Sequence, residues 1–117
     1  MTYETKSNEP KLFVAFENAL EVIESLRDVV VKVRRHRSRL ADQIVDAASS
    51  MAANVEEGNR RVGRDRLYLF RVASGSAAET RAHLRVAKAW GWVEAHEIEP
   101  ALKGLDRELR LLWGLTR

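Results

Sequence analysis

The sequence predicts an all-α protein, most simply one antiparallel up-down-up-down four-helix bundle over residues 1–117. Composition supports helix, because the chain has only two prolines and six glycines among many Ala, Leu, Arg and Glu residues. Apolar residues also recur at steps of three and four in four separate segments, which is typical of amphipathic helices. Short connections between four such helices favour an up-down-up-down arrangement, and no segment has the pattern of a strand.

The first two stripes predict helices on either side of residue 38. The first stripe is Leu12, Phe16, Ala19, Ile23, Leu26, Val30 and Val33. Ser7 or Asn8 is expected to cap this helix, with Pro10 in its first turn and residues 1–8 as a flexible segment. The second stripe is Ala41, Ile44, Ala48, Met51 and Val55. Its helix is expected to begin after Ser38 and to end at Gly58 in a left-handed conformation.

The last two stripes follow a polar connection at residues 58–64. The third stripe is Phe70, Ala73, Ala77, Thr80, Leu84 and Ala87, and Gly91 is expected to close its helix. The fourth stripe is Ile98, Leu102, Leu105, Leu109 and Leu112. Pro100 predicts that the fourth helix begins a turn or less before it, or is kinked there.

Gly75 lies among small residues inside the third helix, where glycine costs about 1 kcal/mol relative to alanine. We expect a close approach of two helices to compensate for this cost. A hairpin centred near residue 61 places Gly75 opposite Ala47 and Ala48. The same register places Gln43 near Glu79.

A motif in the middle of the chain resembles a known family. Its residues run from Gln43-Ile44 through Ala47, Ser50 and Asn54-Val55-Glu56-Glu57-Gly58 to Phe70, Ala73, Gly75-Ser76 and Glu79. The pattern is similar to that of bacterial bundle proteins encoded in intervening sequences of large-subunit ribosomal RNA genes. Two positions depart from it: the family often has a basic residue at Asp46 and alanine at Glu56. A family arginine that pairs with the Glu79 carboxylate would be missing here.

The resemblance implies a four-helix bundle that assembles as a ring-shaped homopentamer. It implies no activity, because the family's function is essentially unassigned. Related bundle proteins are accessory factors of diversity-generating retroelements, where they bind a reverse transcriptase and its RNA. Within the motif, Asn54 and Glu57 have two interpretations. They form a binding surface at one end of the bundle, or they anchor the end of the second helix and its turn.

The sequence offers no catalytic constellation, and we expect no metal and no cofactor. The absence of cysteine excludes disulfides and thiolate metal sites. A di-iron bundle needs Glu-x-x-His pairs, and none occurs; Glu79 and His83 are expected to be a surface pair. No apolar run reaches the ~20 residues needed to cross a membrane, and the polar N-terminus does not resemble a signal peptide. We therefore expect a cytoplasmic protein.

Two clusters of basic residues are candidates for nucleic-acid contact. The first cluster is Lys32, Arg34, Arg35, Arg37 and Arg39, and the second cluster is Arg60, Arg61, Arg64 and Arg66. Glu94, Glu97 and Glu99 are expected beside the first cluster, so the second is expected to contribute more to binding. No aromatic residue is interleaved with either cluster, which argues against sequence-specific reading of single strands. The alternative for both clusters is a solvated charged face.

Apolar residues outside the predicted stripes indicate self-association. They are Phe13, Val14, Val22, Val29, Val31, Trp90, Trp92, Leu111, Trp113 and Leu115. We therefore expect a non-enzymatic homo-oligomer, a pentamer by resemblance, that binds RNA or a nucleic-acid–protein complex through its clustered arginines, so that its partner is RNA or a nucleic-acid-binding protein. The alternative is a protein-interaction scaffold without nucleic-acid contact.

Overall fold

Five helices make up nearly all of residues 13–117, which are the residues that the computed structural model describes. They are α2 (Val14–Ser25), α3 (Arg27–His36), α4 (Ser38–Asn59), α5 (Gly63–Ala89) and α6 (Ala95–Thr116). No strand occurs in this range, so the predicted all-α class is confirmed. The expected caps at Ser7 or Asn8, the role of Pro10 and the segment 1–8 lie outside the described residues.

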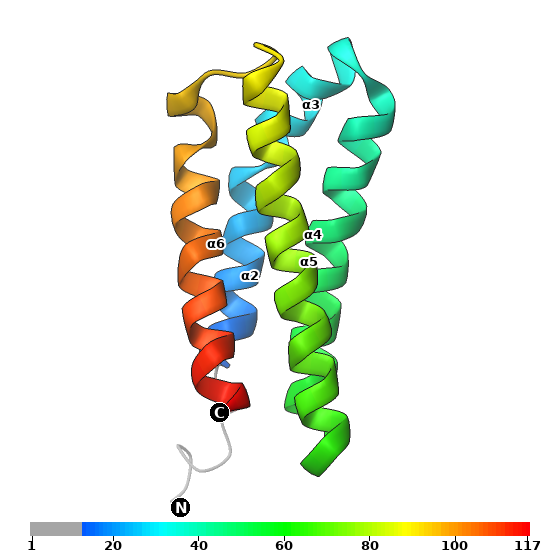
Figure 1. Cartoon of the computed structure of the whole chain (residues 1–117), viewed down its shortest axis with the longest axis vertical. Helices are drawn as coiled ribbons and strands as arrows, with labels where there is room; N and C mark the ends of the chain where they lie inside the picture. Colours follow the sequence, from blue (N-terminus) through cyan, green and yellow to red (C-terminus); the bar gives the residue numbers. More distant parts are fainter. Residues whose placement is uncertain (1–12) are drawn as a thin grey trace, which may run out of the picture.

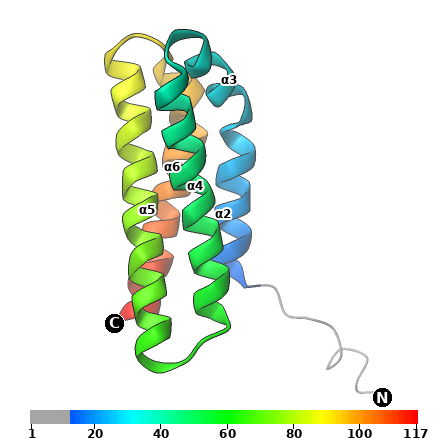
Figure 2. The ribbon, with the colours of Figure 1, turned by 90° about the vertical axis from the view of Figure 1, so that its right-hand side faces the viewer.

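The helices run side by side along an axis of 55 Å (Figures 1 and 2). Helix α4 packs on α5, α5 on α6, and α6 on α2, while α2 and α3 both contact α4. The α3–α4 junction and the α5–α6 connection lie at one end of the molecule, here named the α3–α4 end (Figure 1). The α4–α5 connection lies at the opposite end, here named the α4–α5 end (Figure 2).

The first predicted helix is divided into two, so the described chain has five helices where the sequence predicted four. The division is at Leu26, whose amide donates a hydrogen bond to the Ile23 carbonyl three residues earlier. The Ser25 hydroxyl donates to the Val22 carbonyl at 2.6 Å. It therefore competes with the Leu26 amide, which would bind this same oxygen in a continuous helix. Such back-bonding by serine bends helices.

The buried stripe of α2 and α3 differs from the predicted one. Ala15, Val22 and Val29 are buried, whereas Phe16, Ile23 and Val30 are only partly buried. Ala19, Leu26 and Val33 are buried as predicted, so the buried face is rotated by about half a residue, roughly 50° around a helix. Val22 and Val29 belong to the core and do not count as surplus apolar surface.

Helix α6 buries a glutamate that the sequence pattern did not identify. The positions in steps of three and four are Ile98, Ala101, Leu105, Glu108 and Leu112, and all five are buried. Leu102 and Leu109, which were predicted for the core, pack at its margin. The helix begins five residues before Pro100, somewhat earlier than predicted.

The small-residue contact between α4 and α5 is not at Gly75, and that prediction is wrong. Gly75 is exposed, and a Cβ atom added there meets nothing within 4 Å. Gly75 lies about 200° around the helix from both Ala73 and Ala77, which face the core. The Ser76 hydroxyl donates to the Ser50 hydroxyl at 3.0 Å, so the hairpin is centred at residue 63 rather than 61.

Gly58 makes the close contact instead. It is buried within α4, and a Cβ atom there would lie 2.7 Å from Cε1 of Phe70. The expected left-handed stop at Gly58 is wrong, because only Gly63 and Gly91 have positive φ among the described residues. The stop at Gly91 is confirmed. Its amide donates to the Lys88 carbonyl and the next amide donates to the Ala87 carbonyl, which is a Schellman motif.

Candidate nucleic-acid interface

The first basic cluster surrounds a one-residue junction between two helices. Arg37 is the only residue between α3 and α4, and its backbone is extended. Arg34, Arg35 and His36 occupy the last turn of α3, where cationic side chains interact favourably with the helix dipole. The sharp turn at Arg37 therefore gathers cationic side chains from two helices at the α3–α4 end.

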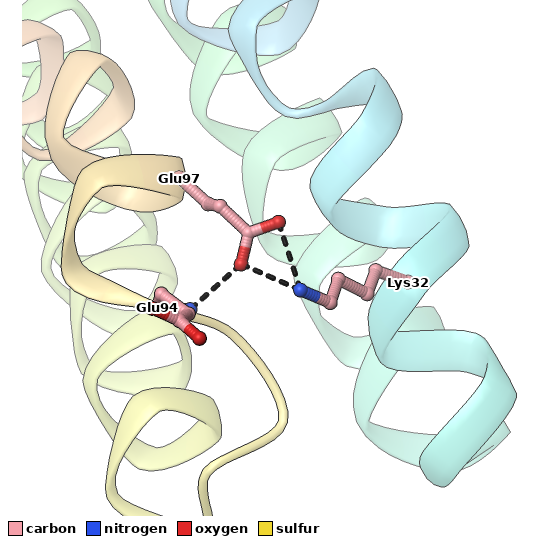
Figure 3. Close-up of polar contacts among 3 residues, drawn as sticks. All are labelled: Lys32, Glu94 and Glu97. Atoms are coloured by element: carbon pink, nitrogen blue, oxygen red, sulfur yellow. Dashed lines mark hydrogen bonds and ion pairs between the residues drawn. The ribbon is translucent and has the colours of Figure 1, made fainter.

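Acidic residues neutralise only part of this cluster. Lys32 Nζ donates to both Glu97 carboxylate oxygens, at 2.8 and 2.9 Å (Figure 3). The Glu94 amide donates to the same carboxylate at 2.7 Å, and the hydrogen bond from Lys32 lowers the pKa of Glu97. Arg34 forms an ion pair with Asp42 at 2.7 Å. Between residues 13 and 117, no carboxylate pairs with Arg35, Arg37 or Arg39.

Two arginines of the second cluster also form ion pairs or hydrogen bonds with other groups of the protein. Arg61 pairs with Glu57 at 2.8 Å and with Asp65 at 3.8 Å. Arg66 donates to the Gly58 and Asn59 carbonyls at 3.3 Å, and its guanidinium lies 4.8 Å from the Phe70 ring centroid. Over the described range, Arg60 and Arg64 have no ion pair. Glu97 thus pairs with the first cluster as expected, and Glu57 and Asp65 pair with the second, so carboxylates offset part of each cluster.

An aromatic stack lies beside the first cluster, contrary to the expectation from the sequence. The rings of Trp92 and His36 are 5.7 Å apart between centroids with 6° between their planes. Trp90 stacks on Trp92 at 5.7 Å and 15°. Both geometries are in the range of offset aromatic stacking. Trp92 also packs against the core, whereas Trp90 is 68% exposed.

The stack borders a groove of about 340 Å³. The groove is lined by Arg37, Arg39, Leu40, Gln43, Val86, Trp90 and Trp92. Val86 also lines a second hollow, together with Arg85, Lys88 and Ala89. Within residues 13–117, neither Arg85 nor Lys88 has an ion pair. The aromatic stack and the basic residues of the two hollows thus lie next to one another on the surface: His36, Arg37, Arg39, Arg85, Lys88, Trp90 and Trp92.

The polar residues of the family motif have local structural roles. Asn54 donates to the Ser50 carbonyl at 2.8 Å and to its hydroxyl at 3.1 Å. That hydroxyl also accepts from Ser76, so the three side chains connect α4 to α5. Glu57 accepts a hydrogen bond from Arg61, so Asn54 and Glu57 both make local contacts of the kind that the second of the two interpretations expects.

The expected contact between Gln43 and Glu79 is absent. Gln43 is exposed at the groove beside Val86, which follows from the shifted register of the hairpin. Glu79 instead contacts Nε2 of His83 at 3.2 Å, one helical turn away. Among residues 13–117, no three His, Asp or Glu side chains group closely enough to hold a metal ion. None of the described helices combines the length and apolar character of a membrane span.

Comparison with known proteins agrees with the fold. The sequence model of the 23S rRNA-intervening sequence protein family matches residues 13–114. A crystal structure from Bacteroides thetaiotaomicron, described as a protein with unknown function from the S23 ribosomal protein family, superposes with a TM-score of 0.79. The two sequences are 16% identical, and the superposition covers 88% of this chain and 98% of the other. No curated protein matches the chain significantly.

Proposed function

The chain belongs to the 23S rRNA-intervening sequence protein family, and from the arrangement of its cations we propose that it binds RNA without catalysing a reaction. Family membership assigns no activity, since the structural neighbour is itself described as having unknown function. The proposal therefore depends on the side chains of this chain. We propose that the protein binds this RNA either alone or as part of a complex with a nucleic-acid-binding protein. The second possibility follows from the resemblance to retroelement accessory proteins.

The observation that supports it is the cluster of unpaired cations at the α3–α4 end. Arg35, Arg37, Arg39, Arg85 and Lys88 have no carboxylate partner among residues 13–117. The nearby acids Asp42 and Glu97 are occupied by Arg34 and Lys32. Phosphate contacts by arginine and lysine provide most of the sequence-independent affinity for nucleic acid. We therefore place the main RNA contact at the first cluster, with Arg60 and Arg64 contributing less.

The proposal includes self-association of a cytoplasmic protein. We regard α2 and α3 as one interrupted arm of an antiparallel four-helix bundle, and five bundles as a ring. The exposed apolar residues Val14 and Trp113 support an interface. Near them is a groove of about 440 Å³, lined by Phe13, Val14, Ala15, Arg110, Leu111, Gly114 and Leu115. Repeating one basic surface around a ring would multiply the phosphate contacts and raise affinity steeply.

An apolar groove favours the second candidate, a protein-interaction scaffold. It measures about 390 Å³ and lies where α2, α3 and α4 meet. Its apolar lining is Ile23, Leu26, Val30, Val31, Ile44, Val45 and Ala48. An amphipathic helix of a partner could pack there. In this alternative the arginines serve solubility and make no contact with nucleic acid.

Charge reversal at two matched sites tests the proposal. One double variant, Arg37→Glu with Arg39→Glu, reverses two charges of the first cluster. The matched double variant, Arg60→Glu with Arg64→Glu, reverses two charges of the second cluster. Fluorescence anisotropy of labelled RNA should show about tenfold or greater weakening for the first pair and a smaller effect for the second. Affinity should also fall steeply with salt. No binding of the wild type at low salt would reject the proposal in favour of the scaffold.

A further inference from the structure

We propose that the exposed ring of Trp90 is a stacking platform for an unpaired base of single-stranded RNA, with Arg37 and Arg39 contacting adjacent phosphates. The inference rests on the proposed RNA binding and adds to it the class of nucleic acid and the residue that recognises it.

The first argument is the way in which Trp90 is held. It follows the last residue of α5, and the Schellman motif at Gly91 fixes the direction of the chain there. Trp92, which packs against the core, supports the Trp90 ring nearly parallel to its own. The Trp90 ring is therefore both 68% exposed and oriented. A preorganised ring loses little conformational freedom when a base stacks on it.

The second argument is charge. Arg37 and Arg39 line the same groove as Trp90, and Arg85 and Lys88 lie beyond Val86. Cations that line the groove of an exposed ring and the hollow next to it match a strand whose backbone passes the ring while one base contacts it. This surface does not suit a two-fold symmetric contact with a second copy of the chain. Such a contact would place the same cations of both copies opposite each other, and like charges repel.

The third argument distinguishes single strands from duplexes. In a duplex the faces of the bases are covered by their stacked neighbours, so an aromatic side chain reaches them only in unpaired segments. The Trp90 platform therefore predicts a preference for single strands. Arginine contacts alone predict no such preference, because both forms carry phosphates.

Fluorescence anisotropy with two labelled probes tests this inference: an oligouridine, and an RNA duplex with the same number of phosphates. The wild type should bind the oligouridine more tightly than the duplex. Trp90→Ala should weaken oligouridine binding about tenfold, within the range for one stacked base. Trp90→Phe should restore most of the affinity. Tyr68→Ala is the matched control, since Tyr68 is an aromatic residue of α5 that is 66% exposed, and it should leave the affinity unchanged within twofold.

The salt dependence separates this inference from the proposed function. Trp90→Ala should keep the wild-type salt slope, whereas alanine at Arg37 or Arg39 should reduce it by about 0.7 for each phosphate that is no longer neutralised. Unchanged affinity in Trp90→Ala, with weakened binding in the arginine variants, would overturn the stacking platform and leave RNA binding intact. A smaller molecular mass of Trp90→Ala in light scattering would also overturn it, since Trp90 would then be a contact between subunits. No binding by any form would defeat both proposals.

Discussion

Asn18 and Glu108 form a hydrogen bond inside the core, where Asn18 Nδ2 donates to Glu108 Oε1 at 2.9 Å. Asn18 also donates to the Gly104 carbonyl and accepts from Arg107 at 3.2 Å. Both partners are buried, and Glu108 Oε2 has no hydrogen-bond partner. This polar pair connects α2 to α6 at a position where the sequence pattern leads one to expect an apolar contact.

Glu108 should make the protein less stable as the pH rises. Burial raises the pKa of Glu108 from its ordinary value of 4.5 to about 7, so the folded state retains a proton that the unfolded state releases. Between these two values the unfolded state binds fewer protons, and the free energy of unfolding should fall by roughly 3 kcal/mol in total. Glu108→Gln should flatten this pH dependence. Urea unfolding from pH 5 to 8 measures the effect.

The control for that experiment is Glu24→Gln, because Glu24 is exposed on α2. It should keep the pH dependence of the wild type. A wild type whose stability is constant over this range would show that Glu108 is ionised in the folded protein. The interpretation of its buried environment would then be wrong.

Two glycine-to-alanine substitutions should have opposite effects on stability. Gly58→Ala places a Cβ atom 2.7 Å from the fully buried Phe70 ring, and overpacking of this kind costs about 1–3 kcal/mol. Gly75→Ala adds a methyl group to open space on a helix and should stabilise the protein by about 0.5–1 kcal/mol. Chemical unfolding of both variants measures the difference. If Gly75→Ala destabilised the protein, Gly75 would have to lie in a contact between subunits.

Glu97 should stabilise the α3–α4 end through two separable interactions. Glu97→Gln keeps an acceptor for the Glu94 amide but removes the ion pair with Lys32, and Glu97→Ala removes both. The thermal midpoint should therefore fall from wild type to Gln and further to Ala. Because the pKa of Glu97 is lowered, this contribution is present above pH 4.5 and disappears at lower pH. Glu99→Ala, at an exposed ion pair, serves as the control.

The protein should be an oligomer in solution. Light scattering at micromolar concentration should give five times the chain mass of 13.3 kDa. Trp113→Glu should lower this mass, because it places a charge on an exposed apolar surface. A mass near 13.3 kDa for the wild type would contradict the oligomer, and a stable dimer would retain an interface but exclude the ring.

The helices were predictable from the sequence because their apolar periodicity is strong. The stripe of the third predicted helix is buried as predicted, from Phe70 to Ala87. The break at Leu26 was not predictable from periodicity, since the apolar pattern continues through it and the bend depends on a hydrogen bond of Ser25. Glu108 was missed for a related reason: a charged residue at a core position interrupts the apolar pattern, and Leu109 beside it offers an alternative.

The candidate interface was only half predictable. The first arginine cluster is contiguous in sequence, so composition alone identifies it. Trp90 and Trp92 are separated from Arg37 by more than fifty residues, and their stacking depends on the turn at Gly91. The up-down order that placed Glu94 and Glu97 near the first cluster also places both tryptophans there. That consequence of the topology is the signal that could have identified them.

Photocrosslinking to RNA that contains 4-thiouridine tests the central claim most directly, because it locates the RNA on the protein. The proposal predicts crosslinked peptides from residues 34–39 and 85–92, with Trp90 as a principal site. Peptides from residues 57–66 should be crosslinked weakly. Crosslinks confined to residues 57–66, or none at low salt with the RNA in excess, would contradict the proposed interface.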